Sequence, residues 1–127
     1  MKTRIYLAGG FNGGWHEKVT NELGNFEIFN PQKHNLDEVE KYTSWDLFHV
    51  KKCDILLGYM SEDNPSGYGL ALEIGYANAL NKLIILVDER SKKDEKFKRY
   101  FSICHASSNV ILNSLEEAIN YIKTFEI

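Results

Sequence analysis

Short apolar runs alternate along this chain with segments whose apolar positions recur every three or four residues. The first pattern indicates buried strands, and the second indicates helices that turn one face toward a core. Continuous apolar runs, such as 53–60 and 82–88, are typical of central parallel strands covered on both faces. The pattern predicts strands at 4–10, 26–31, 53–60, 82–88 and 109–112. It predicts helices at 14–23, 36–51, 68–80 and 114–125, the last with Ser114 as N-cap and Glu117 three residues on.

This alternation predicts the fold class. Strands that take turns with helices form a doubly wound α/β structure, here a five-stranded parallel sheet in a flavodoxin-like three-layer sandwich. The 127 residues contain no repeat and no linker, so we expect a single domain that spans 1–127. Ligands of such folds bind beyond the carboxyl ends of the strands. The loops predicted to lie there are 9–15, 30–34 and 61–67.

Composition narrows the classes of partner. The 15 Lys and Arg against 18 Asp and Glu give a net charge of −3, and no basic run exceeds a pair. We therefore expect no nucleic acid polymer and no membrane as partner, and a small molecule instead. The N-terminal apolar run is too short for a signal peptide, and Cys53 and Cys104 fit no disulfide or zinc pattern. These features predict a cytoplasmic protein.

Common loop chemistries do not match the glycine-rich sequence after the first strand. Phe11 stands where the dinucleotide fingerprint needs its second glycine, and no P-loop sequence is present. The third strand ends in Gly-Tyr-Met, without the acidic residue of a phospho-acceptor site. The four histidines lack metal-ligand spacing, and we expect each at the surface or in a loop. The sequence thus predicts no metal and no organic cofactor.

One carboxylate stands alone in an apolar helical stretch. Glu73 has Gly69, Leu70, Tyr76 and Ala77 as its neighbours one helical turn away, and none of them is charged. One explanation is structural, namely a buried hydrogen bond or compensation of the helix dipole. The other is a nucleophile in a partly desolvated pocket, which attacks the anomeric carbon of a sugar. The residue pattern leaves both open.

Two aspartates differ in their predicted positions. Asp54 opens the third strand, so it lies at the end of the sheet away from the ligand, and we interpret it as structural. Asp46 borders the inward stripe of its helix, which makes it a candidate for the site.

The segments IYLAGGF, WDLFHVKKCDILLGYM and GYGLALEIGYANALNK together resemble the nucleoside 2-deoxyribosyltransferase family, which includes the deoxynucleoside 5′-monophosphate N-glycosidases. The resemblance covers nearly the whole chain. It implies that Glu73 is the nucleophile, that Tyr6 orients it and that Asp46 contacts the base and assists its protonation. The substrate-binding residues that we predict with it are Gly9, Phe11, Asn12, Ser66, Gly67 and Ser102.

The resemblance also implies a homodimer or higher homo-oligomer, in which segment 98–109 completes a neighbour's pocket. True transferases often carry an aspartate where this chain has Gly67, and they end in a longer C-terminal segment. The short chain, with Ser66 and Ser102, is closer to the monophosphate hydrolases, although Ser66 is offset by one position and fits a helix N-cap equally well.

Three functions therefore stay open. The first is cleavage of the N-glycosidic bond of 2′-deoxynucleosides through a deoxyribosyl-Glu73 intermediate, with the sugar passed to another base or to water. The second is hydrolysis of 2′-deoxynucleoside 5′-monophosphates. The third is a non-catalytic nucleotide-binding or sensor domain on the same fold.

Overall fold

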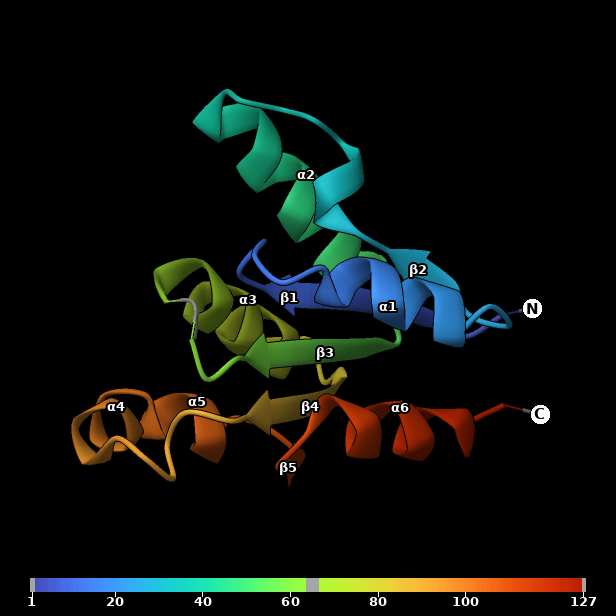
Figure 1. The fold of residues 1–127 in the computed structure, drawn as a ribbon. Helices are drawn as coiled ribbons and strands as arrows, with labels where there is room; N and C mark the ends of the chain where they lie inside the picture. The colour runs from blue at the N-terminus through green and yellow to red at the C-terminus, as the bar shows by residue number, and fades with distance from the viewer. Residues whose placement is uncertain (1, 64–66, 127) are drawn as a thin grey trace.

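A computed structural model describes residues 2–63 and 67–126 (Figure 1). The described chain forms one five-stranded sheet in the order β2-β1-β3-β4-β5, and every neighbouring pair of strands is parallel. This is the flavodoxin-like order, so the predicted fold class is confirmed. The strands are β1 (Arg4–Gly9), β2 (Glu27–Phe29), β3 (Ile55–Met60), β4 (Leu83–Asp88) and β5 (Val110–Leu112).

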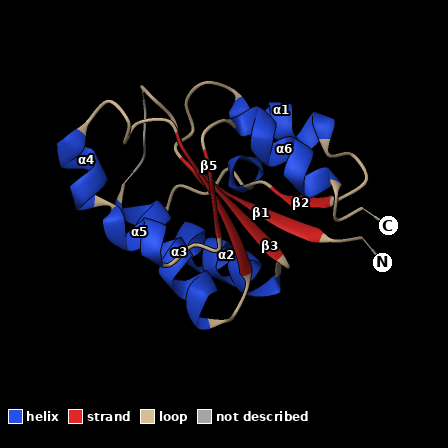
Figure 2. Ribbon diagram, turned by 90° about the horizontal axis from the view of Figure 1, so that it is seen from below, coloured by secondary structure: helices blue, strands red, loops and turns tan. Residues whose placement is uncertain are grey.

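Helices cover both faces of the sheet, as the view along it shows (Figure 2). One face packs against α1 (Trp15–Glu22) and α6 (Leu115–Lys123), and the other against α2 (Val39–Lys52), α3 (Tyr68–Ala79) and α5 (Ser102–Ala106). The short α4 (Glu95–Tyr100) precedes α5, and a 3₁₀ turn, η1 (Pro31–Lys33), follows β2.

Strand alternation divides the core into two clusters. In β1, Ile5 and Leu7 pack with the side chains of α1 and α6, whereas Tyr6 and Ala8 face the α2 and α3 side. All four side chains are buried, because a central parallel strand is covered on both faces. The alternation of β1 thus turns the hydroxyl of Tyr6 toward the helix that carries Glu73.

The structure corrects several expected boundaries. The second strand ends at Phe29, because Pro31 begins the turn η1, and α2 begins at Val39, three residues later than predicted. Segment 95–106, for which no element was predicted, forms α4 and α5. Ser114 caps α6 as predicted and accepts a hydrogen bond from the backbone N–H of Glu117 at 3.2 Å.

The expectation that every histidine lies at the surface or in a loop is wrong for His16. Its side chain is fully buried on α1, where it contacts the Trp15 ring at a centroid distance of 3.9 Å. Burial lowers the pKa of His16 to about 4, so the ring is neutral at physiological pH. It serves the core as an aromatic side chain.

Helix α2 is the least covered of the long helices. Its C-terminal end lies on the sheet, and its N-terminal half projects beyond it (Figure 1). Within Val39–Lys52 only Val50 is buried, while Val39 and Phe48 keep 57% and 62% of their surface exposed. Among residues 2–63 and 67–126, no helix has the length and apolar character that crossing a membrane requires.

Candidate active site

A cavity of about 290 Å³ lies where the carboxyl end of β1 meets α2 and α3. This size is close to the roughly 300 Å³ at which small-molecule sites begin. Its lining comes from four parts of the chain: β1 with its following loop, the segment around η1, α2 and α3. The lining residues are Tyr6, Leu7, Gly9, Phe11, Pro31, His34, Leu36, Tyr42, Asp46, Gly69, Leu70 and Glu73.

The predicted nucleophile and its predicted partner meet in this cavity. The hydroxyl of Tyr6 donates a hydrogen bond to Oε2 of Glu73 at 2.6 Å. Tyr6 is fully buried and Glu73 keeps 9% of its surface exposed, so the bond is shielded from water. A bond this short fixes the orientation of the Glu73 carboxyl group.

Local packing brings Glu73 to this position. Helix α3 lies close to β3 because Gly58 has no side chain; a Cβ there would lie 3.2 Å from Leu86 and 3.3 Å from Leu70. Leu70 and Ala77 are buried on the same helical face as Glu73. The helix ends before Asn81, whose φ of 59° is left-handed.

Asp46 lies on α2 across the cavity. Its side chain keeps 22% of its surface exposed, yet Oδ1 is fully buried and makes no hydrogen bond. Nε2 of His34 lies 3.5 Å from this oxygen. His34 itself is fixed by the backbone N–H of Leu36, which donates to its Nδ1 at 3.0 Å.

Burial controls the electrostatics of the two carboxyl groups. Desolvation raises the pKa of Glu73 to about 8, the hydrogen bond from Tyr6 opposes this shift, and the negative charge of Asp46 adds to it. Desolvation also raises the pKa of Asp46, and the neighbouring His34 and Tyr6 oppose that shift. Burial and Glu73 raise the pKa of Tyr6 strongly, so Tyr6 remains a hydrogen-bond donor.

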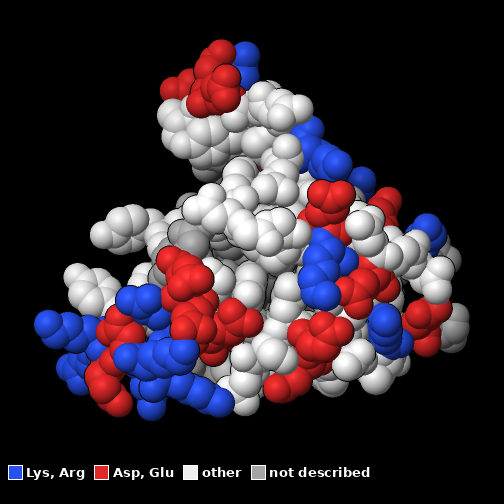
Figure 3. Space-filling model, viewed as in Figure 1, with Lys and Arg blue, Asp and Glu red and all other residues white. Residues whose placement is uncertain are grey.

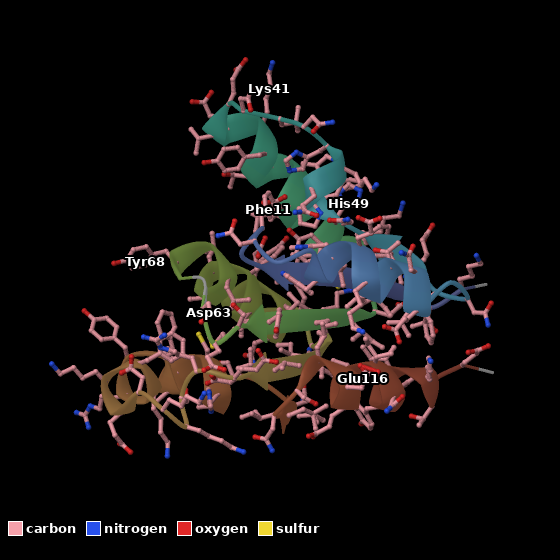
Figure 4. The ribbon with its side chains drawn as sticks, in the orientation of Figure 1. Phe11, Lys41, His49, Asp63, Tyr68 and Glu116 are labelled. Carbon is pink, nitrogen blue, oxygen red and sulfur yellow. The ribbon has the colours of Figure 1, made fainter. Side chains whose placement is uncertain are left out.

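The predicted substrate-binding residues lie in different places. Gly9 and Phe11 line the cavity, and Figure 4 shows Phe11 beneath α2. Gly9 is also needed for packing, since its φ is +150° and a Cβ would lie 2.7 Å from the carbonyl oxygen of Tyr59. Asn12 is exposed and does not line the cavity.

Gly67 and Ser102 do not line the cavity. Gly67 borders a separate groove between α3 and α5, and the hydroxyl of Ser102 donates to the carbonyl of Arg99 at 2.9 Å. Ser66 lies outside the described residues. Asp54 forms an ion pair with Arg4 at 3.1 Å at the start of β3.

Sequence reasoning missed part of the lining. His34 and Pro31 belong to a loop that was expected at the site, but no spacing singled out either residue. Tyr42 is one turn before Asp46 on α2, so the helical period could have identified it. Leu36, Gly69 and Leu70 are non-polar and carry no chemical signal of their own.

Two carboxyl groups with different surroundings face one cavity. A buried carboxylate oriented by a tyrosine is suited to attack an electron-poor carbon, and a second carboxyl group with a raised pKa is suited to give a proton to a leaving group. The same pairing is used where glycosidic bonds are cleaved.

Comparison with known proteins places the chain in a family. Residues 2–91 match the family model described as "Nucleoside 2-deoxyribosyltransferase like". No sequence among the curated proteins matches the chain.

Solved structures give the same fold. A conserved protein from Enterococcus faecalis has a TM-score of 0.73 at 17% identity, over 98% of this chain and 99% of that one. A 2-desoxiribosyltransferase from Leishmania mexicana has a TM-score of 0.73 at 16% identity, with the same coverage. A CMP N-glycosidase from Clostridium botulinum has a TM-score of 0.62 at 24% identity, over 96% of this chain and 99% of that one.

The family model covers most of the chain, including β1, α2, β3 and α3, from which Tyr6, Asp46 and Glu73 come. The resemblance predicted from the sequence is thereby confirmed. The chain belongs to the nucleoside 2-deoxyribosyltransferase-like family.

Proposed function

We propose that this protein cleaves the N-glycosidic bond of 2′-deoxynucleosides through a covalent deoxyribosyl-Glu73 intermediate and passes the sugar to another base or to water. One observation carries the proposal: the 2.6 Å hydrogen bond by which Tyr6 orients a buried Glu73 in a cavity that Asp46 also lines. A structural glutamate has no need of a second carboxyl group with a raised pKa beside the same cavity.

Each residue has one task in this mechanism. An oxygen of Glu73 bonds to C1′ while the C1′–N bond breaks and its electron pair passes to the base. Asp46 gives its proton to a ring nitrogen of that base, and the Tyr6 hydroxyl holds Glu73 in line. A second base or a water molecule then attacks C1′ and gives up its proton to the Asp46 carboxylate, while the C1′–O bond to Glu73 breaks and Glu73 leaves as a carboxylate. The chain's own side chains supply every proton and charge of this sequence.

The test is incubation of the protein with deoxynucleosides, with and without a free acceptor base, followed by chromatography. Released base supports hydrolysis, and a new nucleoside that contains the added base supports transfer. A fluorinated or slow 2′-deoxy analogue should leave a deoxyribosyl adduct on the peptide that contains Glu73, detectable by mass spectrometry. Inversion at C1′ without an adduct would contradict the covalent mechanism.

A second candidate is hydrolysis of 2′-deoxynucleoside 5′-monophosphates. It is favoured by the likeness to a protein named CMP N-glycosidase, which has the highest identity of the three structures described above. The same incubation with monophosphates distinguishes the two activities by the ratio of their rates.

A homodimer belongs to this proposal, because uncovered apolar side chains surround the α2 and α3 side. Tyr68 on α3 is 92% exposed and points away from the body of the protein (Figure 4), and Tyr100 and Ile103 are 79% and 70% exposed. The two ends of this side of the molecule, the tip of α2 and the segment before and in α4, differ in the sign of their charge. The α2 tip carries Asp37, Glu38 and Glu40 with Lys41, whereas segment 92–99 carries five basic residues beside two acidic ones, Asp94 and Glu95 (Figure 3). A second copy that sets its α4 and α5 against α2 would match both properties.

A further inference from the structure

Asp46 and His34 form an incomplete pair. Among residues 2–63 and 67–126, the buried side-chain polar atoms without a hydrogen bond belong to two residues, His16 and Asp46. His16 contacts the aromatic rings of Phe11 and Trp15, which explains its place in the core. Asp46 instead lines the candidate active-site cavity. The lack of a hydrogen bond to its buried Oδ1 therefore needs a chemical explanation.

The tautomer of His34 follows from the backbone. Leu36 donates its N–H to Nδ1 of His34 at 3.0 Å, so Nδ1 accepts and the proton of the neutral ring is on Nε2. The ring also contacts the indole of Trp45 edge-on, at a centroid distance of 4.9 Å, which restricts its rotation. The Nε2–H group therefore belongs to a ring of fixed orientation, and Nε2 lies 3.5 Å from Oδ1 of Asp46.

The 3.5 Å distance fits a neutral Asp46. A hydrogen bond to a carboxylate is shorter, about 2.7 to 2.9 Å, and a neutral carboxyl oxygen has less need of a donor. The donor becomes important when Asp46 loses its proton, because a buried carboxylate without a partner is costly. A shift of a few tenths of an ångström then completes the bond, as is common when a catalytic site binds its substrate.

We propose that His34 is a positioning residue, which orients Asp46 and stabilises through its Nε2–H the carboxylate that remains when Asp46 gives its proton to the departing base. This inference rests on the proposed N-glycosidic cleavage. In that step the O–H bond of Asp46 breaks, an N–H bond forms on the base, and the new negative charge of Asp46 is shared with Nε2–H of His34. The other groups near Asp46 are Tyr6, Tyr42 and Glu73 in the cavity, and His49 on α2 itself.

Two substitutions of His34 distinguish the contribution of Nδ1 from that of Nε2. His34→Asn keeps an oxygen near the position of Nδ1, which accepts from Leu36, but its side chain is too short to reach Asp46. His34→Gln is longer and can present an amide N–H where Nε2 lies. The matched control is His49→Gln, because His49 stacks on the same Trp45 at 3.8 Å but does not line the cavity.

The substrates separate the role of His34 from that of Glu73. A 2′-deoxynucleoside of an unmodified purine needs a proton on its leaving base, whereas an N7-methylated purine already carries a positive charge and leaves without one. We expect His34→Asn to lower kcat on the unmodified substrate about tenfold to hundredfold, with KM little changed. On the N7-methylated substrate the loss should stay within about threefold. His34→Gln should recover most of the lost rate, and His49→Gln should keep it throughout.

The pH profile gives a readout that a purely structural role would not move. Nearby His34 lowers the pKa of Asp46, so His34→Asn should shift the limb of the kcat/KM profile on which Asp46 loses its proton to higher pH. Equal losses on both substrates, or no recovery with His34→Gln, would overturn the inference. Failure of the proposed function is distinct from both, because the wild-type protein would then release base from neither substrate, and Glu73→Gln would change nothing.

Discussion

The two faces of the sheet differ in how they are covered. The α1 and α6 face is closed by buried apolar side chains, and the buried His16 on α1 is an uncharged ring. The α2 and α3 face holds a buried carboxylate, a cavity and a helix of which only Val50 is buried along Val39–Lys52. The first face is closed by an apolar core, and the second holds a buried carboxyl group and leaves apolar surface exposed. The predictions below test this division.

The largest expected effect is on turnover. Glu73→Gln keeps an acceptor for the Tyr6 hydroxyl and removes the nucleophile, so kcat should fall by about 10⁴-fold or more. Initial rates of base release measure this loss. Glu116→Gln on α6 is the control, since Glu116 is exposed on the other face, and its rate should not change. Full activity in Glu73→Gln would end the mechanism and favour a nucleotide-binding or sensor role.

The same variant should gain stability. The pKa of Glu73 is about 8 in the folded state and near 4.5 in the unfolded state, so the folded protein binds its proton more tightly. Wild-type stability from this group is full below pH 4.5 and is lost as pH rises toward 8. The advantage of Glu73→Gln should therefore grow from pH 4.5 to pH 8, to at most about 5 kcal/mol. Urea unfolding at both pH values tests this, and an advantage that does not change with pH would contradict it.

The second prediction compares the two faces by their apolar side chains. Ile119 on α6 is fully buried, so Ile119→Ala should lower the free energy of unfolding by about 2 to 5 kcal/mol. Phe48 on α2 is 62% exposed, so Phe48→Ala should cost a dilute monomer less than about 0.5 kcal/mol. Denaturant unfolding at low protein concentration measures both values.

The same two substitutions should have the opposite order of effect on dimerisation. If α2 is covered by a second copy, Phe48→Ala should weaken the dimer, while Ile119→Ala should affect it only through folding. Sedimentation velocity over a range of protein concentrations follows the equilibrium. A wild-type protein that stays monomeric at all concentrations would remove the assembly from the proposal.

The third prediction concerns pH and the pair of carboxyl groups. The form of the protein that can react has Glu73 ionised and Asp46 protonated, so the two carboxyl groups together hold one proton. At low pH both groups bind a proton, and above about pH 8 neither does, so kcat/KM should be bell-shaped with its alkaline limb near pH 8. Rates from pH 4.5 to 10 measure the profile.

The Asp46→Asn variant should give a pH profile that depends on the ionisation of Glu73 alone. With an N7-methylated substrate, which needs no acid, the alkaline limb should vanish and the rate should rise with pH to a plateau. The midpoint of that rise should lie below 8, because the negative charge of Asp46 no longer raises the pKa of Glu73. A bell that survives the substitution would assign the acid to another residue.

The sequence predicted those parts of the structure in which apolar residues repeat at the spacing of a strand or a helix. Strand alternation and helical spacing identified the sheet, and with the family resemblance they indicated Tyr6, Asp46 and Glu73, whose places in the fold the period determines. His34 follows η1 and precedes Asn35, whose φ of 52° belongs to no repeating pattern, so its contact with Asp46 could not be read from spacing.

Other misses have different causes. The helices α4 and α5 have only six and five residues, so neither stands out from the sequence by length, although Phe97, Phe101 and Cys104 recur at helical spacing. His16 shares a helical face with Val19 and Leu23, so its spacing indicates the core, although a polar side chain by itself favours the surface. Of the two serines predicted to bind phosphate, Ser66 lies outside the described residues and Ser102 does not line the cavity of its own chain.

The last and smallest prediction therefore asks whether Ser102 serves a neighbour's site. The Ser102 hydroxyl donates to the backbone carbonyl of Arg99 at 2.9 Å, and Ser102 is exposed. Its hydroxyl can therefore turn toward a second copy. Ser102→Ala should lower kcat/KM on a deoxynucleoside 5′-monophosphate about tenfold, for one charge-assisted hydrogen bond, and leave the unphosphorylated nucleoside unchanged. Ser108→Ala is the matched control, because that hydroxyl also donates to a backbone carbonyl, at 2.7 Å.

Mixing two inactive or weakened variants then tests sharing directly. In a hybrid of Ser102→Ala with Glu73→Gln, one site combines an intact Glu73 with an intact Ser102 from the other copy, so monophosphate turnover should exceed the sum of the separate variants. Random pairing makes about half of the dimers hybrid, which restores about a quarter of all sites. Additive rates in the mixture, from a protein shown to be dimeric, would mean that each cavity works with its own chain alone and that Ser102 has no part in binding phosphate.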